Sequence, residues 1–248
     1  MLRRWIAAGL DPATVTVVTR SGQGAPDGVR ALTALPDEDA PATLMLALKP
    51  QQIDAAQALL APMRGAPRLL LSILAGVDHA TLSARFAADT IVRAMPNLPV
   101  AIGKGVTSLY TGAAPAEAIT AAEAFAAPLG HYEWIADEAQ FDAVTALAGC
   151  GPGFVFRFAD ALAKAGAALG LPADQAARLS IATLEGAAVM AAAADVSPAV
   201  LADRVASPGG STREGMNVLD CDDALVRLLT QTLAASERRN AEMAAAAR

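Results

Sequence analysis

The feature that most constrains the fold of this chain is a change of hydrophobic pattern near residue 137. Before that point, short apolar runs alternate with segments of helical character. The expected strands are residues 14–18, 43–48, 68–73, 90–93, 106–110 and 132–135, and the expected helices are residues 2–8, 26–34, 51–61, 78–87 and 115–127. Strands that are apolar on both faces and alternate with helices indicate a mostly parallel sheet covered on both sides. We therefore predict a Rossmann-like α/β domain over residues 1–137.

After Asp137 the sequence shows only helical patterns. The expected helices are residues 138–147, 152–169, 173–194, 198–205, 211–219 and 222–246. The segment 173–194 is small and apolar on nearly every side, and a helix of that kind must be buried all round. A second subunit that covers these helices is the favoured interpretation, and a compact monomeric bundle is the alternative. Residues 138–248 are thus expected to form an all-helical dimerisation domain.

Charge and cysteine content exclude several classes of protein. The net charge is −6 and the basic residues are scattered, whereas a nucleic-acid-binding face needs clustered basic residues. Cys150 and Cys221 are the two cysteines, without a CxxC motif or a histidine cluster, so neither a disulfide framework nor a metal site is predicted. The longest apolar run, 186–194, is about half the ~20 residues that a membrane-spanning helix needs. We expect a cytoplasmic protein with no membrane or nucleic-acid partner.

A glycine-containing loop, residues 207–214, is the first candidate for a ligand site. Ser211 and Glu214 have the spacing of a capping box, which predicts a helix that begins just after Gly210. Such a start leaves unpaired N–H groups and a partial positive charge that suit a small carboxylate or phosphate. The alternative is that the loop only connects two helices.

The turns after the strands are the second candidate region, because ligands of parallel sheets bind beyond the carboxyl ends of the strands. These turns are residues 19–21, 49–50, 75–76 and 95–97. NAD-binding folds usually place a carboxylate at the end of the strand that Arg20 follows here. A cation at that position suits the 2′-phosphate of NADP, although an ordinary exposed arginine is the alternative.

The printed sequence contains no G-x-G-x-x-G turn near its start, where a dinucleotide-binding sheet normally has one. Gly22 and Gly24 follow a strand but lack the third glycine and the helix that should come directly after it. The chain opens inside a helix, so the strand and turn that would precede that helix are not in the sequence. We expect the reading frame ahead of Met1 to encode an apolar run followed by this motif.

Six stretches, taken in order, resemble the pyrroline-5-carboxylate reductase family, whose members catalyse the last step of proline biosynthesis. They are ALKPQ (47–51), SILAG (72–76), RAMPNLP (93–99), GKGVT (103–107), DAVTAL with GCGP (142–152) and SPGGST (207–212). The resemblance extends from Trp5 to the final helix. Three positions depart from the family pattern: Leu98 stands where Thr is usual, Cys150 where Ser is common, and Gly153 where Ala is usual.

The resemblance implies NADPH-dependent reduction of the C=N bond of 1-pyrroline-5-carboxylate, with NADP(H) favoured over NAD(H). It assigns the substrate carboxylate to Ser207, Gly209, Gly210, Ser211 and Thr212. Thr212 is the candidate catalytic residue, because its hydroxyl can donate to the substrate nitrogen. The candidate cofactor residues are Arg20, Lys49, Pro50, Met95, Pro96 and Asn97. Lys49 could instead be a solvated charge at a strand end, and Asn97 a turn residue whose side chain caps its own loop.

The resemblance also implies a homodimer or larger homo-oligomer, in which the 207–212 loop closes on the partner's nucleotide domain. Two other functions stay open at this point. One is a reductase of the same architecture that acts on another cyclic imine or a keto acid. The other is a non-catalytic dimer that does not bind a dinucleotide.

Overall fold

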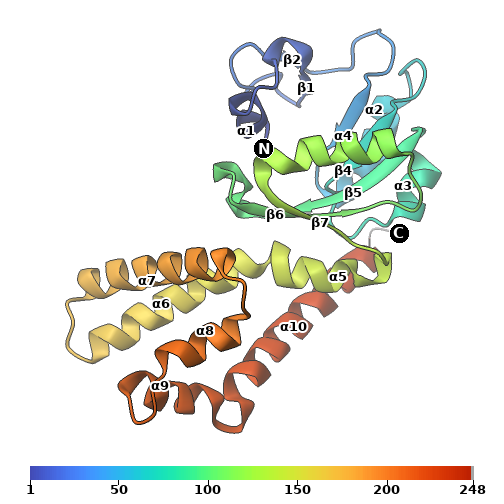
Figure 1. Ribbon diagram of the computed structural model, residues 1–248. Helices are drawn as coiled ribbons and strands as arrows, with labels where there is room; N and C mark the ends of the chain where they lie inside the picture. The colour runs from blue at the N-terminus through green and yellow to red at the C-terminus, as the bar shows by residue number, and fades with distance from the viewer. Residues whose placement is uncertain (247–248) are drawn as a thin grey trace. The chain divides into compact units, whose positions relative to one another are not determined.

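The computed structural model describes residues 1–246 and divides into two compact units (Figure 1). The sheet-bearing unit contains Met1–Cys150 and the chain from Ala235 on, and the helical unit contains Gly151–Ala234. The α/β architecture followed by an all-helical region confirms the predicted fold class.

The sheet-bearing unit holds seven described strands in two sheets. They are β1 (Thr16–Val18), β2 (Arg30–Leu32), β3 (Thr43–Leu46), β4 (Leu69–Ser72), β5 (Thr90–Pro96), β6 (Gly105–Tyr110) and β7 (Gly130–Trp134). β1 and β2 form a parallel pair, while β3-β4-β5-β6-β7 form a five-stranded sheet in that order. Among residues 1–246 no strand pairs with both β1 and β3, so the two sheets are not joined. In a doubly wound sheet one further strand occupies that place.

The helices of this unit are short and cover both faces of the five-stranded sheet. They are α1 (Leu2–Ala7), α2 (Ile53–Leu60), α3 (His79–Arg85), α4 (Ala116–Ala126) and α5 (Phe141–Val144). On one face, Ala122 and Ala126 of α4 pack against Leu71 and Val92. On the other face, α2 and α3 pack against Leu70 through residues such as Leu82, and both leucines are fully buried. This two-sided burial explains why the strands are apolar on both faces.

Two sequence-based expectations for this unit need correction. The weak helix expected over residues 26–34 is wrong, because the segment contains strand β2, which pairs with β1 in parallel. Pro26 and Gly28 precede the strand, and Gly28 has a φ of +80°, which a helix does not allow. Strand β5 also continues beyond Arg93 to Pro96, because its last four residues pair with β6 in the antiparallel sense.

The two units divide at Cys150, which differs from the division expected at residue 137. Phe141 is only 2% exposed and Ala146 is 1% exposed, so the segment that follows Asp137 packs against the sheet-bearing unit. The end of α10 (Ala224–Ala246) lies along the same segment. There Ser236 Oγ donates to Cys150 Sγ at 3.2 Å, and Asn240 Nδ2 donates to the Asp142 carbonyl at 3.4 Å.

The helical unit consists of α6 (Gly151–Ala168), α7 (Ala173–Ala193), α8 (Pro198–Val205), α9 (Ser211–Asp220) and the first part of α10. α6 and α7 form an antiparallel hairpin (Figure 1). Inside it Ser180 Oγ donates to the Ala159 carbonyl at 2.8 Å, and both residues are buried. Most large apolar side chains of the unit are nevertheless exposed, including Phe156, Leu179, Ile181, Val189, Met190 and Val218.

By length and composition alone, α7 could cross a membrane. Most of its residues are exposed in the single chain, which agrees with the expectation that this helix needs a covering surface. A core helix of an oligomeric protein has the same length and composition. The exposed faces therefore show that the helical unit needs a partner surface, whether protein or lipid.

Candidate active site

The carboxyl ends of the parallel strands β3, β4 and β5 lie at one edge of the five-stranded sheet (Figure 1). Lys49 and Pro50 follow β3, while Met95 and Pro96 end β5. Lys49 is exposed, and its backbone N–H donates to Gln52 Oε1 at 3.2 Å, which fixes the start of the following helical turn. Met95 and Pro96 are half-buried. The structure thus brings these four candidate cofactor residues to the same sheet edge.

Asn97 lies at this edge but its side chain points into the protein. It is 9% exposed, its Oδ1 accepts the Val106 N–H at 2.8 Å, and its Nδ2 donates to the Ala148 carbonyl at 2.9 Å. Both ends of the carboxamide are therefore engaged within the sheet-bearing unit. Leu98, the residue that departs from the family pattern, is 68% exposed beside it.

Arg20 lies just after β1, in the two-stranded sheet, and is exposed. The turn around it is held by the Gly22 N–H, which donates to the Thr19 carbonyl at 3.3 Å, and by Ser21 Oγ, which accepts the Gln23 N–H at 3.3 Å. Among residues 1–246 the guanidinium makes no ion pair. An exposed cation at a strand end fits the recognition of a phosphate.

Neither of two cavities lined by described residues forms a dinucleotide site. One, of about 20 Å³, lies between the sheet and α4 and has room for a single water molecule. The other, of about 280 Å³, is lined by Arg93 but also by the carboxylates of Asp78, Glu138 and Asp142, which disfavour a phosphate. Outside these cavities, the exposed cations of Arg20 and Lys49 at the strand ends each suit part of a dinucleotide. A glycine-rich pyrophosphate cradle is not found in the described part of the chain.

The loop 207–212 forms a compact turn that leads into α9 in the helical unit. Gly210 N–H donates to the Ser207 carbonyl at 3.0 Å, and a Cβ on Gly210 would lie 2.7 Å from Ser207 Oγ, so a side chain there would displace the Ser207 hydroxyl. Gly209 has a φ of +70°, which also favours glycine. The helix begins at Ser211, which confirms the predicted start after Gly210.

The predicted capping box does not form. The N-cap of α9 is Gly210, no side chain caps the helix, and Ser211 and Thr212 are exposed at its first two positions. Arg213 instead donates to Asp203 Oδ1 at 2.8 Å and to the Ala206 carbonyl at 3.1 Å, which ties the start of α9 to the end of α8. The uncapped N–H groups, with the hydroxyls of Ser211 and Thr212, make a helix start that suits a carboxylate.

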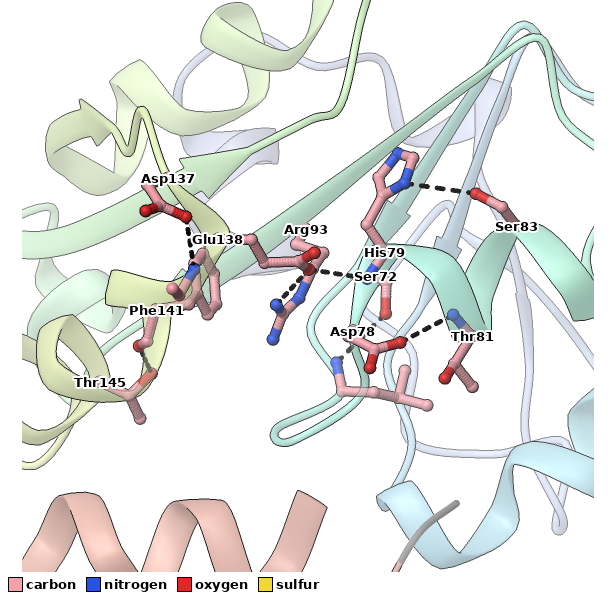
Figure 2. A network of polar contacts seen from close by, with 12 residues as sticks. Ser72, Asp78, His79, Thr81, Ser83, Arg93, Asp137, Glu138, Phe141 and Thr145 are labelled. Carbon is pink, nitrogen blue, oxygen red and sulfur yellow. Dashed lines mark hydrogen bonds and ion pairs between the residues drawn. The ribbon is translucent and has the colours of Figure 1, made fainter. Parts of the chain in front are cut away.

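The sequence-based reasoning missed a buried polar network around Arg93 (Figure 2). Arg93 is 5% exposed on β5, pairs with Glu138, and lies over the Phe141 ring with its Cζ 4.0 Å from the centroid. Glu138 Oε1 also accepts the backbone N–H of His79 at 2.7 Å. The sequence contains one signal of this network, a single arginine in the otherwise uncharged strand TIVRAMP.

Comparison with known proteins supports a single family. The model for pyrroline-5-carboxylate reductase dimerisation matches residues 138–243. The pyrroline-5-carboxylate reductase of Pseudomonas aeruginosa is 36% identical over 238 residues, which cover 94% of this chain and 85% of that protein.

This chain belongs to the pyrroline-5-carboxylate reductase family. A solved pyrroline-5-carboxylate reductase from Coxiella burnetii superposes with a TM-score of 0.84 at 28% identity, over 97% of this chain and 92% of that one. The NADP-bound enzyme of Plasmodium falciparum has a TM-score of 0.79 over 98% of this chain and 92% of that one. At 21% identity, that second likeness supports the fold alone.

Proposed function

We propose that this chain reduces 1-pyrroline-5-carboxylate to L-proline with NADPH as the hydride donor. The observation that supports this most is the 36% identity to the Pseudomonas aeruginosa reductase, which extends over both units of the chain. The exposed Arg20, which makes no ion pair among residues 1–246, favours NADP(H) over NAD(H).

The candidate residues have complementary tasks in this reaction. When bound, NADPH would supply a hydride to the carbon of the C=N bond, and the nitrogen, which receives the electron pair, would take its proton from solvent. The uncapped start of α9, with Ser207, Gly209, Gly210 and Ser211, holds the substrate carboxylate. The Thr212 hydroxyl donates a hydrogen bond to the nitrogen. Lys49, Pro50, Met95 and Pro96 orient the cofactor at the sheet edge, so positioning supplies most of the rate enhancement.

The protein works as a homodimer or larger homo-oligomer built through residues 138–248, which we treat as the dimerisation domain beside a dinucleotide-binding domain over residues 1–137. The dimerisation model covers α7, so a second subunit rather than lipid covers its exposed faces. We also propose a cytoplasmic location. An exposed Leu98 in place of the usual Thr leaves a second candidate, a reductase of another cyclic imine.

The assay is NADPH oxidation, followed by absorbance, with 1-pyrroline-5-carboxylate and with its six-membered-ring analogue. It is run on the 248-residue chain and on any longer chain that its reading frame encodes ahead of Met1. We expect turnover with the five-membered ring to exceed that with the six-membered ring. The reverse order would favour the second candidate, and no oxidation with either imine in any of these chains would contradict the reductase.

The role of Thr212 is tested by two matched variants. Thr212→Val removes the hydroxyl at constant shape and should lower kcat by about 10²–10³-fold, as loss of a placed donor does elsewhere. Thr212→Ser keeps a hydroxyl and should retain activity within about tenfold of wild type. Equal losses in both variants would show that the methyl group, not the donor, matters.

A further inference from the structure

Asn97 connects three segments of the sheet-bearing unit. Its backbone N–H donates to the Val106 carbonyl at 3.0 Å, and its Oδ1 accepts the Val106 N–H at 2.8 Å. Its Nδ2 reaches the Ala148 carbonyl, 51 residues further along the chain, at 2.9 Å. The end of β5 is thereby joined both to β6 and to the segment that follows Asp137.

The Ala148 carbonyl is available to Asn97 because of the local sequence. In a regular α-helix this carbonyl would accept the N–H of residue 152, but that residue is proline and has no N–H. The chain here forms a π-helical turn, Thr145–Gly149, in which the Cys150 N–H donates to the Thr145 carbonyl at 2.9 Å. Ala148 is half-buried, and the Asn97 amide supplies its carbonyl with the donor that Pro152 lacks.

The same face of β5 meets the same segment at two further points. Side chains at positions 93, 95 and 97 point to one face of the strand. Arg93 contacts Glu138 and the Phe141 ring, as Figure 2 shows. A Cβ built on Gly149 would lie 3.7 Å from Met95 Cγ, so the turn also lies against Met95. Residues 138–149 thus follow β5 from its middle to its carboxyl end.

We propose that Asn97 is a positioning residue for hydride transfer, not a direct ligand of the cofactor. Its bond to Ala148 fixes Met95 and Pro96, at the edge where the nicotinamide is held, to the segment 138–149. Arg93, through Glu138 and Phe141, holds the start of the segment 138–149 against the middle of β5. This inference rests on the proposed function for its consequence in catalysis, whereas the hydrogen-bonded connection itself is independent of it.

The decisive variant is Asn97→Asp, because it separates the two hydrogen bonds. Its carboxylate can still accept the Val106 N–H, but it has no donor for Ala148 and places an oxygen against that carbonyl. We expect kcat to fall by about 10²-fold, the cost of a small misplacement of the reacting groups. The dissociation constant for NADPH should change less than about threefold, because no cofactor contact is removed.

Thr111→Val is the matched control. Thr111 Oγ1 donates to the Ile91 carbonyl at 2.9 Å, a bond of the same kind near the opposite end of β5. This variant should lower the melting temperature while kcat stays within about twofold of wild type. A second variant, Pro152→Ala, supplies an N–H that competes for the Ala148 carbonyl, so it should change kcat in the same direction as Asn97→Asp but less.

Hydrogen exchange gives a readout that does not depend on activity. In Asn97→Asp, peptides that cover residues 94–107 and 142–150 should exchange faster than in wild type, and in Thr111→Val the 142–150 peptide should not change. If exchange of the 142–150 peptide is unchanged in Asn97→Asp, the proposed connection between Asn97 and Ala148 is wrong.

A loss of kcat without faster exchange would indicate direct cofactor contact and would also overturn the proposal. An equal loss of kcat in Thr111→Val would overturn it too. If the wild-type chain reduces no imine, the proposed function fails while exchange still decides the connection.

Discussion

The two units of this chain differ in how far their apolar side chains and ion pairs are buried. In the sheet-bearing unit, Leu70, Leu82 and Val92 are fully buried, and the one arginine of β5 has a carboxylate and an aromatic ring as partners. In the helical unit, Val189 and Met190 are 65% and 64% exposed. The ion pairs within its helices link exposed side chains three or four residues apart, as between Asp160 and Lys164.

This difference shows where each unit obtains its stability. The sheet-bearing unit buries its apolar surface largely within one chain, so its stability depends on internal packing and on its buried polar network. The helical unit leaves its apolar surface open, and a surface of that kind marks an interface. The match to a dimerisation family over residues 138–243 agrees with that interpretation.

The largest expected effect comes from placing charge on the open face of the helical unit. The double substitution Val189→Glu with Met190→Glu should raise the dimer dissociation constant at least about 10³-fold, because unpaired carboxylates would be buried in the interface. Sedimentation velocity over a concentration series measures this. Gln175→Glu adds the same charge at an exposed polar position of α7 and should leave the dimer intact. An unchanged dimer in the double variant would place the interface elsewhere.

The buried ion pair of the sheet-bearing unit should matter more than an exposed one. Arg93→Met removes a guanidinium that is 6% exposed and should lower the free energy of unfolding by about 3 kcal/mol, since Glu138 loses its partner. Urea unfolding followed by Trp5 and Trp134 fluorescence measures the change. Arg85→Met, which breaks the pair with the exposed Asp54, should cost less than about 1 kcal/mol. Similar costs for the two variants would contradict this distinction.

The two-stranded sheet allows a test of cofactor choice. Arg20→Ala should weaken NADPH binding by about 1.5–3 kcal/mol, the scale of hydrogen bonds to charged groups, and should leave NADH binding nearly unchanged. Titration of each cofactor by fluorescence gives both values. Arg30→Ala, on the neighbouring strand, removes an arginine that already pairs with Glu38 and serves as the control. Equal weakening of NADPH and NADH binding would leave Arg20 with a structural role only.

The elements that the sequence predicted well are those whose signals are local. The helix 198–205 lies where a serine and a proline mark its start, and the expected strands 68–73 and 90–93 lie on apolar runs that are buried on both faces. The start of α9 was predicted correctly from the spacing of Ser211 and Glu214. Its cap was not, since the turn closes through Gly210 and leaves Ser211 inside the helix.

The elements that were missed depend on partners far away in the sequence. Strand β2 is only three residues long, which is too short for a local signal, and it is a strand because it pairs with β1. Asn97 was expected to contact the cofactor or cap its own loop, but its donor group serves a carbonyl 51 residues away. The proline at position 152 signals a carbonyl without a helical donor, yet nothing local identifies which amide satisfies it.

The smallest expected effect concerns the exposed pairs of the helical unit. A hydrogen bond from Lys164 lowers the pKa of Asp160 below its ordinary value of 3.8; desolvation opposes this shift, and the charges of Lys164 and Arg157 add to it. Because the folded pKa is lowered, the stabilisation is complete above the unfolded pKa and is lost as the pH falls through the folded pKa.

A carboxyl NMR titration should show the pKa of Asp160 rising toward 3.8 in Lys164→Met. The pKa of Asp174, lowered chiefly by its hydrogen bond from Arg178, should stay unchanged as the internal control. Since both carboxylates are exposed, the melting temperature at pH 7 should hardly change in Lys164→Met. A large change would mean that this stretch of α6 is covered in the dimer, and the contrast between the two units would then extend to its ion pairs.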